Sequence, residues 1–273
     1  MKRNLFTIAL VVLAVGLLGS CKKGNDPESP KLQEGVLPGA FTVNAEGRTV
    51  YFSKGNLQAT VDAAGAPTSW RFAANQYDCV GEGGANKVIG QAAGDVDLFG
   101  WSTAGSNFGI SASTSDSVYY GDFVDWGKAF CEYKKLADSI WRTLSKDEWK
   151  YLVTTRTVNG GEGMNKSFSY DITYGGIVGA VLYPDDYTGP ALSGTVNTLP
   201  EGVVFLPSAG YRYGSKVGDV GSSCEYWSSS AYDEDDAYLA VFYSGGVDPD
   251  DDVPRLYGYA VRLVTESKYI TEK

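Results

Sequence analysis

The sequence has no histidine, and its four cysteines form no Cys-X-X-Cys pair in a chain of 273 residues. Without an imidazole the chain cannot build a Ser-His-Asp or Cys-His nucleophile, or the histidine-rich sites that usually hold catalytic zinc. No glycine-rich segment is followed by the lysine of a phosphate-binding loop. Paired carboxylates remain as a route to catalysis, because two acids at a suitable distance can hydrolyse a glycoside. We expect no enzymatic activity, no catalytic residue and no cofactor.

Basic residues are also scarce, with 23 Lys and Arg against 33 Asp and Glu and a net charge of −10. Nucleic acids and anionic membrane surfaces attract proteins that present a basic surface, so neither is an expected electrostatic partner. The composition is 43% hydrophobic and 13% aromatic, which excludes a largely disordered chain. Thirty-four glycines between short aromatic and β-branched runs favour strands and turns over long helices.

The N-terminus has the pattern of an export signal. Lys2 and Arg3 precede an uncharged apolar run, 5–18, which is shorter than the roughly 20 residues of a membrane-spanning helix. The tetrapeptide Leu18–Cys21 resembles the bacterial lipobox, in which the chain is cut before a cysteine that is then acylated. We expect a signal peptide over 1–20 and lipidation of Cys21, which would anchor the protein in the cell envelope, at the outer membrane and exposed on the surface. An uncleaved N-terminal anchor is the alternative.

The residues after Cys21 read as a tether followed by one folded domain. Residues 21–38 are polar and contain three prolines, so they cannot build a core. We place the folded domain over 39–265 and a short C-terminal tail over 266–273. Cys79 and Cys131 could form a disulfide, or both could remain buried free thiols like Cys224.

Periodicity predicts an α+β fold with two helices, short antiparallel strands and long irregular loops. Ser145 followed by Glu148 forms a capping-box pattern that predicts a helix running to about Thr155. A second helix is predicted over 126–139 from the helical spacing of its apolar residues. The remaining predicted elements are a hairpin formed by 41–43 and 50–52, and strands at 176–183, 203–206, 238–242 and 260–264.

Seven short segments within residues 41–264 carry a family resemblance: Phe52–Gln58, Trp70–Ala73, Leu98–Thr103, Trp141–Trp149, Phe205–Arg212, Tyr226–Ser230 and Gly258–Val264. They resemble surface lipoproteins of the bacterial major paralogous domain group. This resemblance implies a C-type lectin-like fold of the formylglycine-generating-enzyme type, with central strands at the Trp-Ser-Ser and Val-Arg-Leu-Val segments. Trp149, Trp227 and Arg262 are expected to be scaffold residues. The enzymes of that fold use a cysteine pair near the C-terminal region, where this chain has only Cys224, so the activity is not expected here.

The segment between those two strands has an unusual composition. Residues 226–259 hold six of the 19 tyrosines and eight acidic residues, with Arg255 as the only basic residue. Tyrosine gives a large amphipathic contact area at low entropic cost, which suits adaptable recognition surfaces. The segment also resembles the variable region of proteins diversified by retroelements. Sequencing the locus in sibling strains tests whether its codons vary more than those of Trp227 and Arg262. The candidate varied positions are Tyr232, Asp235, Asp236, Tyr238, Ala240, Tyr243, Asp250, Asp251, Asp252, Val253, Leu256, Tyr257 and Tyr259.

We therefore predict a surface protein that binds an extracellular protein or glycan through one face rich in tyrosine and aspartate. A structural subunit of a surface appendage or envelope complex is the alternative from another class. The predicted ligand-binding residues are Tyr232, Asp235, Asp236, Tyr238, Tyr243, Asp250, Asp251, Asp252, Leu256, Tyr257 and Tyr259.

Calcium is the metal that the spacing of acidic residues in this segment suggests. Asp248, Asp250 and Asp252 have the alternate spacing of a calcium loop, which is otherwise read as a solvated acidic turn. An EF-hand is excluded because Val253 stands where the loop needs glycine and Tyr259 where it needs glutamate. A looser site of oxygen ligands involving Asp233, Asp235 or Asp236 remains an alternative.

Overall fold

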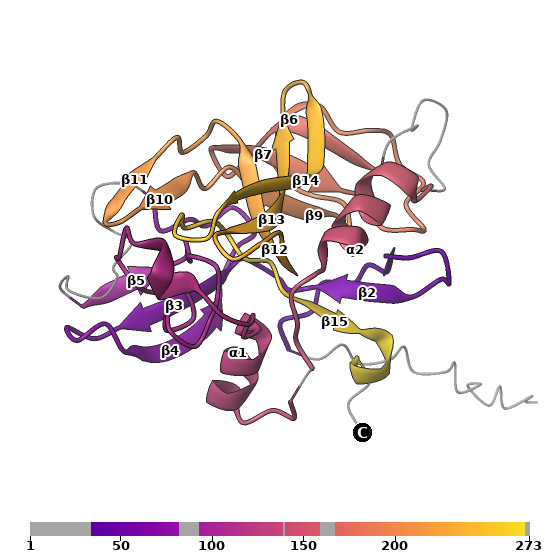
Figure 1. Cartoon of the computed structure of the whole chain (residues 1–273). Coiled ribbons are helices and arrows are strands. Elements are labelled where there is room, and N and C mark those ends of the chain that lie inside the picture. The colour runs from indigo at the N-terminus through magenta and orange to yellow at the C-terminus, as the bar shows by residue number, and fades with distance from the viewer. Residues whose placement is uncertain (1–33, 82–92, 139, 159–166, 271–273) are drawn as a thin grey trace, which may run out of the picture.

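The computed structural model describes residues 34–81, 93–138, 140–158 and 167–270, arranged as five small sheets and two α-helices (Figure 1). Every strand pairing in these residues is antiparallel except that of β6 with β8. The predicted α+β class is confirmed at this level, and the molecule is rich in β structure. The predicted signal peptide and Cys21 lie outside the described residues. No helix within the described ranges has the length and apolarity needed to cross a membrane.

The strands before the helices are β1 (Phe41–Thr42), β2 (Thr49–Phe52), β3 (Leu57–Val61), β4 (Pro67–Phe72) and β5 (Gly94–Val96). The helical elements are η1 (Asp116–Tyr119), α1 (Trp126–Lys134), α2 (Lys146–Lys150), η2 (Tyr151–Thr155) and η3 (Ser267–Tyr269). The later strands are β6 (Phe168–Tyr174), β7 (Ile177–Leu182), β8 (Gly194–Val196), β9 (Val204–Pro207), β10 (Tyr211–Tyr213), β11 (Lys216–Gly218), β12 (Cys224–Ala231), β13 (Asp236–Tyr243), β14 (Gly246–Pro254) and β15 (Val264–Glu266).

The sheet of β1, β2 and β15 joins the two ends of the folded part. The predicted hairpin is confirmed, since Phe41 of β1 faces Val50 of β2 in an antiparallel pair. The backbone N–H of Leu37 donates to the carbonyl of Phe52, so the fold begins before residue 39 and the predicted tether extends too far. The predicted tail from 266 is likewise wrong at its start, because Glu266 ends β15, η3 follows and Ile270 is buried.

Both predicted helices form, one of them shorter than expected. Ser145 and Glu148 make the reciprocal hydrogen bonds of a capping box at the start of α2, and the helical backbone continues as the π-helix η2 to the predicted end at Thr155. The helix α1 stops at Lys134, five residues before the predicted end. Lys135 adopts a left-handed conformation (φ 56°) and its N–H caps the carbonyl of Cys131, which closes the helix there.

The predicted strand at 260–264 is mostly wrong, because β15 begins only at Val264. Residues 261–263 run beside the segment between β2 and β3 with irregular pairing. Leu57 donates to the carbonyl of Val261 and Ser53 donates to the carbonyl of Leu263, without forming a continuous ladder. The predicted scaffold role of Arg262 agrees with its burial, as only 1% of it is exposed.

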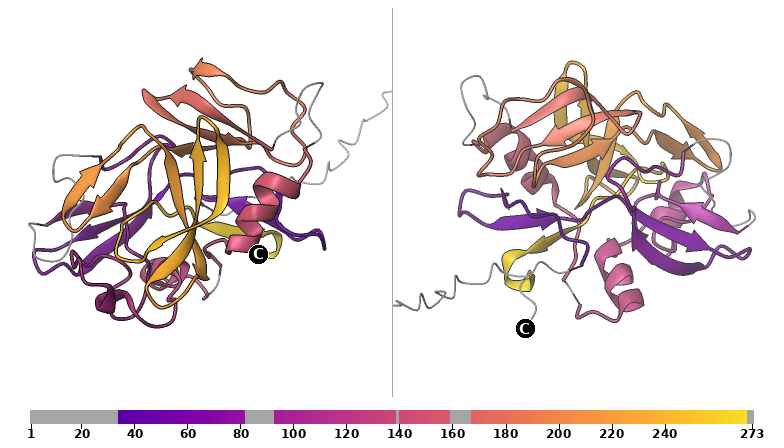
Figure 2. Two further views of the ribbon diagram at one scale, coloured as in Figure 1. Left: turned by 45° about the horizontal axis from the view of Figure 1, so that its top comes forward. Right: turned by 180° about the vertical axis from the view of Figure 1, so that it is seen from behind.

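The three-stranded sheet of β12, β13 and β14 separates two hydrophobic cores. Along β13, Phe242 packs with Trp149 in the first core, whereas Leu239 packs with Trp227 in the second. Trp149 and Trp227 are fully buried, as predicted. Figure 2 (left) shows these gold strands between α2 and the β10–β11 hairpin. The sheet therefore has one side against α2 and another toward β10.

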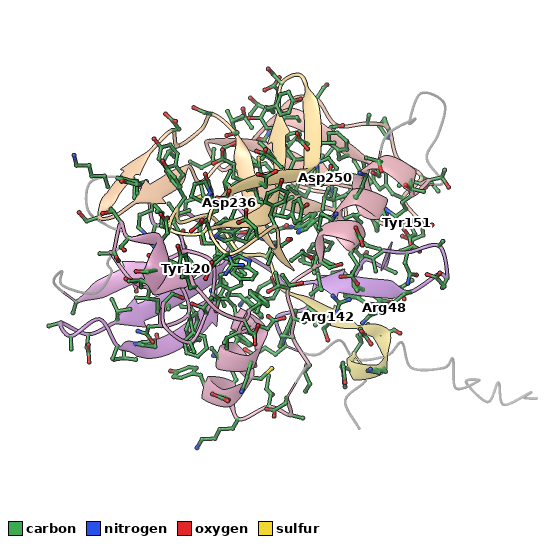
Figure 3. All side chains as sticks on the ribbon, in the orientation of Figure 1. Arg48, Tyr120, Arg142, Tyr151, Asp236 and Asp250 are labelled. Atoms are coloured by element: carbon green, nitrogen blue, oxygen red, sulfur yellow. The ribbon has the colours of Figure 1, made fainter. Side chains whose placement is uncertain are left out.

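An arginine and glutamate cluster fastens α2 to the β1–β2–β15 sheet. Arg142 and Glu148 form a bidentate pair with N–O distances of 2.7 and 2.8 Å, and Arg48 lies 3.5 Å from the same carboxylate. Arg48 also pairs with Glu266 of β15. Figure 3 shows Arg48 and Arg142 side by side beneath α2. Since each charge has an opposite neighbour, we assign this cluster a structural role.

The three cysteines of the folded part are free thiols. Cys131 and Cys224 are buried, and Cys79 is partly buried. Cys224 accepts or donates at 3.3 Å with the Ser208 hydroxyl, and burial raises its pKa to about 12. Of the two alternatives for Cys79 and Cys131, the structure has the free thiols and not the disulfide. Protonated, buried thiols behave as small apolar groups.

Candidate functional site

The side of the β12–β14 sheet that faces α2 is called the helix side here. On it, the ammonium group of Lys146 lies 4.6 Å from the centre of the Tyr238 ring, and Lys150 pairs with Asp250 at 2.7 Å. Tyr232, which is 53% exposed, contacts Tyr238 edge to face with ring centres 5.4 Å apart. Tyr238 and Asp250 of the helix side are thus already engaged by lysines of α2.

The opposite side, called the tyrosine side, consists of Tyr211, Tyr213, Glu225, Asp251 and Tyr257. Tyr257 contacts the other two rings, with centres 5.8 Å from Tyr211 and 5.2 Å from Tyr213. Tyr213 is 43% exposed, and the other four residues are partly exposed. Glu225 and Asp251 come from β12 and β14, which flank β13. Burial raises the pKa of Tyr259, the charges of Glu225 and Asp251 raise it further, and its ring lies beside those of Tyr211 and Tyr257. Aromatic rings and carboxylates from three separate segments therefore meet on one partly exposed surface.

Burial and mutual repulsion act on the two carboxylates of the tyrosine side. Partial burial raises the pKa of Glu225, and the negative charges of Asp219 and Asp251 raise it further. The pKa of Asp251 is raised by burial and by the charge of Asp248. In the described part of the chain no lysine or arginine pairs with Glu225 or Asp251. Oε1 of Glu225 accepts from the Ser223 hydroxyl, while its buried Oε2 has no partner.

The buried side chain of Arg212 holds β10 in place and thereby positions Tyr211 and Tyr213. Side chains alternate along a strand, so Arg212 points inward between Tyr211 and Tyr213. Its guanidinium is completely buried and makes four hydrogen bonds of 2.7 to 3.2 Å. All four acceptors are backbone carbonyls, and burial lowers the pKa of the group. The acceptors are the carbonyls of Leu98, Gly109, Ser111 and Gly214.

The predicted ligand-binding residues do not form one patch, and this expectation is wrong. Asp251 and Tyr257 lie on the tyrosine side, whereas Tyr238 and Asp250 lie on the helix side together with Tyr232. Figure 3 shows Asp236 and Asp250 at separate places along the β13–β14 ribbon. The cause is the two-residue period of a strand, which sends neighbouring side chains to opposite sides.

The other predicted residues are placed as follows. Asp252 lies on the helix side, because it is paired with Tyr238 across β13 and β14. Tyr243 lies at the β13–β14 turn, where it is 43% exposed. Leu256 and Tyr259 are only 6% and 7% exposed, so they are corrected to core residues. The Tyr259 ring packs on Trp227 with centres 5.1 Å apart. Ala240, a candidate varied position, is likewise fully buried, and substitution there would disturb the first core.

Asp235 and Asp236 lie on the β12–β13 turn, which is held by internal hydrogen bonds. The carboxylate of Asp233 accepts the backbone N–H groups of both residues, at 2.9 and 2.8 Å. The Tyr120 hydroxyl donates to Asp235 at 2.7 Å, and this bond raises the Tyr120 pKa to about 12. Arg255 donates to the carbonyl of Asp236. The carboxylates of Asp233 and Asp235 thus hold the turn through hydrogen bonds. The described residues contain no group of three or more metal-ligating side chains.

Sequence reasoning missed three members of the tyrosine side. Tyr211 and Tyr213 lie outside the tyrosine-rich segment, and Glu225 precedes it by one residue. The Tyr-Arg-Tyr alternation at 211–213 was an available signal, because it indicates a strand with two rings on one side. Nothing in the sequence alone indicates that β10 lies beside the segment after β14, where Arg212 and Gly258 exchange backbone hydrogen bonds.

No family model, no curated protein and no solved structure matches this chain.

The raised pKa of Glu225 predicts a gain in stability when its charge is removed. The folded state holds the proton more tightly than the unfolded chain, so stability falls as pH rises through the unfolded value, about 4.3. Glu225→Gln keeps the shape and the acceptor for Ser223 without the charge. We expect a higher urea midpoint than the wild type at pH 7, and no difference near pH 3.5. An equal or lower midpoint at pH 7 would contradict this account.

Proposed function

We propose that this chain is a lipid-anchored, surface-displayed protein without enzymatic activity, which binds a protein ligand through the tyrosine side. The proposed frame is the C-type lectin-like fold that the sequence motifs resemble, anchored through Cys21 at the outer membrane. The observation that carries the proposal is the meeting of one exposed and two partly exposed tyrosines with two carboxylates that no described cation neutralises.

The chemistry of this surface favours a partner that presents lysine or arginine. Glu225 and Asp251 are held close enough to raise the pKa of Glu225, so a cation placed between them would relieve both burial and repulsion. Tyrosine rings bind cations and apolar side chains on their faces. The ring of Tyr257 already contacts those of Tyr211 and Tyr213, so binding requires little ordering. A basic protein fits these features better than a neutral glycan.

The test is a binding screen that compares the two sides of the sheet. The whole mature chain, with Cys21→Ser to keep it in solution, is screened on arrays of proteins and glycans. Hits are repeated with Tyr213→Ala/Tyr257→Ala, and the matched control is Tyr232→Ala/Tyr238→Ala on the helix side. We expect basic proteins among the hits, affinity lost at least about tenfold in the first variant, and little change in the control.

The salt dependence of the affinity and the chemical class of the partner distinguish the possible results of this screen. Affinity for a basic protein should weaken as salt is raised, because the contact is electrostatic in part. Glycans that bind with an affinity independent of salt concentration would contradict the proposal of a protein ligand. A partner that binds the tyrosine-side variant as well as the wild type, but does not bind the Tyr232→Ala/Tyr238→Ala variant, would show that the binding site is on the helix side. Partners unaffected by either variant would favour a structural subunit.

A further inference from the structure

A second site lies away from the tyrosine side, in a pocket of about 720 Å³ between α1, the end of β4 and η3. This volume is within the range of about 300–1,000 Å³ that is usual for small-molecule sites. Its wall is largely apolar and is formed by Phe72, Phe130, Leu136, Ile140 and Trp141. Phe72 and Phe130 stack with ring centres 4.3 Å apart, so this wall is formed by packed side chains of β4 and α1.

The polar lining of the pocket is basic although the whole chain is acidic. Lys54, Arg71, Lys134 and Lys268 line it against a single carboxylate, that of Glu34. Arg71 is paired with Asp95 and Lys268 with Glu266. Within the described ranges, Lys54 and Lys134 take part in no ion pair. In a protein of net charge −10, four basic side chains around one apolar pocket are a local concentration of positive charge.

The two kinds of lining call for a ligand with two parts. The basic side chains call for an anionic, electron-rich group, while the phenyl rings of Phe72 and Phe130 call for an apolar body.

We propose that this pocket binds an amphiphile with an acidic head group. The apolar part packs against Phe72, Phe130 and Leu136, and the acid is held by Lys54 and Lys134. Such a molecule could be a free long-chain carboxylate or an anionic lipid drawn from a bilayer. The shared chemistry is an aliphatic body with one anionic end, and neutral or cationic amphiphiles fit the basic lining less well.

The probe is dodecanoate, titrated by calorimetry below its micelle concentration into the whole mature chain carrying Cys21→Ser, so that no acyl group of the protein competes. We expect saturable binding at one site, and at least about tenfold weaker binding by Lys54→Glu/Lys134→Glu, since two attractive charges become repulsive. Lys216→Glu, an exposed charge reversal on β11, is the matched control and should bind as the wild type does. Ala137→Trp, which fills the pocket from its rim, should also weaken binding.

The controls separate this pocket from unspecific adsorption and distinguish the two ligand sources. Dodecanol and dodecyltrimethylammonium should bind at least about tenfold more weakly than dodecanoate. Phosphatidylglycerol vesicles, compared with phosphatidylcholine vesicles, report whether a bilayer lipid serves equally. Equal binding of all three dodecyl compounds, or equal loss in the Lys216→Glu control, would overturn the proposal. Each variant is checked for an unchanged thermal midpoint, and Ala137→Trp keeps the test open should the double charge reversal unfold.

Discussion

Replacing Arg212 with methionine is expected to lower the free energy of unfolding by at least about 3 kcal/mol, because hydrogen bonds from charged groups contribute about 1.5–3 kcal/mol each. The substitution keeps an unbranched side chain but removes the charged donor from four backbone carbonyls at once. Those carbonyls belong to three segments, at Leu98, at Gly109 and Ser111, and at Gly214 directly after β10. The result is measured by equilibrium unfolding in guanidinium chloride.

The matched control is Arg48→Met, because the Arg48 side chain is 46% exposed and its two carboxylate partners keep other cations, Arg142 for Glu148 and Lys268 for Glu266. We expect its cost to stay near or below about 1 kcal/mol. A similar small loss for Arg212→Met would show that water replaces the guanidinium in the core. The substitution should also loosen Tyr211 and Tyr213, so binding at the tyrosine side is expected to weaken even where the variant remains folded.

Replacing Gly109 with alanine is expected to be nearly as damaging, for a different reason. Gly109 has a φ of +77°, and a Cβ there would lie 1.8 Å from the carbonyl oxygen of Gly100. The left-handed conformation costs about 1–3 kcal/mol for a residue with a side chain, and forced overpacking adds about 1–3 kcal/mol. Gly109 also offers its carbonyl to Gly100 and to Arg212, so any shift disturbs the support of β10.

Gly47→Ala is the matched control, since Gly47 has a φ of +79° and nothing within 4 Å of the added Cβ. It carries the conformational cost without the clash. We expect Gly109→Ala to be destabilised by at least about 1 kcal/mol more than Gly47→Ala in the same unfolding assay. Equal losses would show that the backbone of 100–109 adapts without strain.

Local sequence signals predicted local structure well. The capping box at Ser145 and Glu148 and the β1–β2 hairpin are formed by residues within a few positions of one another. The end of α1 was misplaced because the apolar spacing continues past Lys135, whereas a single left-handed residue ends the helix. Periodicity reports which residues can be buried, and it does not report where the backbone turns.

The candidate site was predicted only in part, because it depends on contacts between distant segments. Within the tyrosine-rich segment the strand at 238–242 was predicted, whereas β14 was not, and the alternation of side chains along these strands divides the segment between two sides of the sheet. The choice of side depends on the bulge between Leu239 and Val241, which changes the register of β14. Tyr211 and Tyr257 are 46 positions apart in the sequence yet in contact, and no local pattern predicts that meeting.

The pairing of β2 between β1 and β15 has a mechanical consequence. A chain anchored at its N-terminus would enter the fold at Val36 and Leu37, which are bonded to Ser53 and Phe52 at the end of β2. In Figure 1 the β13–β14 turn lies at the top of the molecule, far from η3, which follows β15. Tension between an anchor and a captured partner would thus be taken up first by the central strand of the β1–β2–β15 sheet. The sheet of β12, β13 and β14, which supplies Glu225 and Asp251, would be spared until that strand yields.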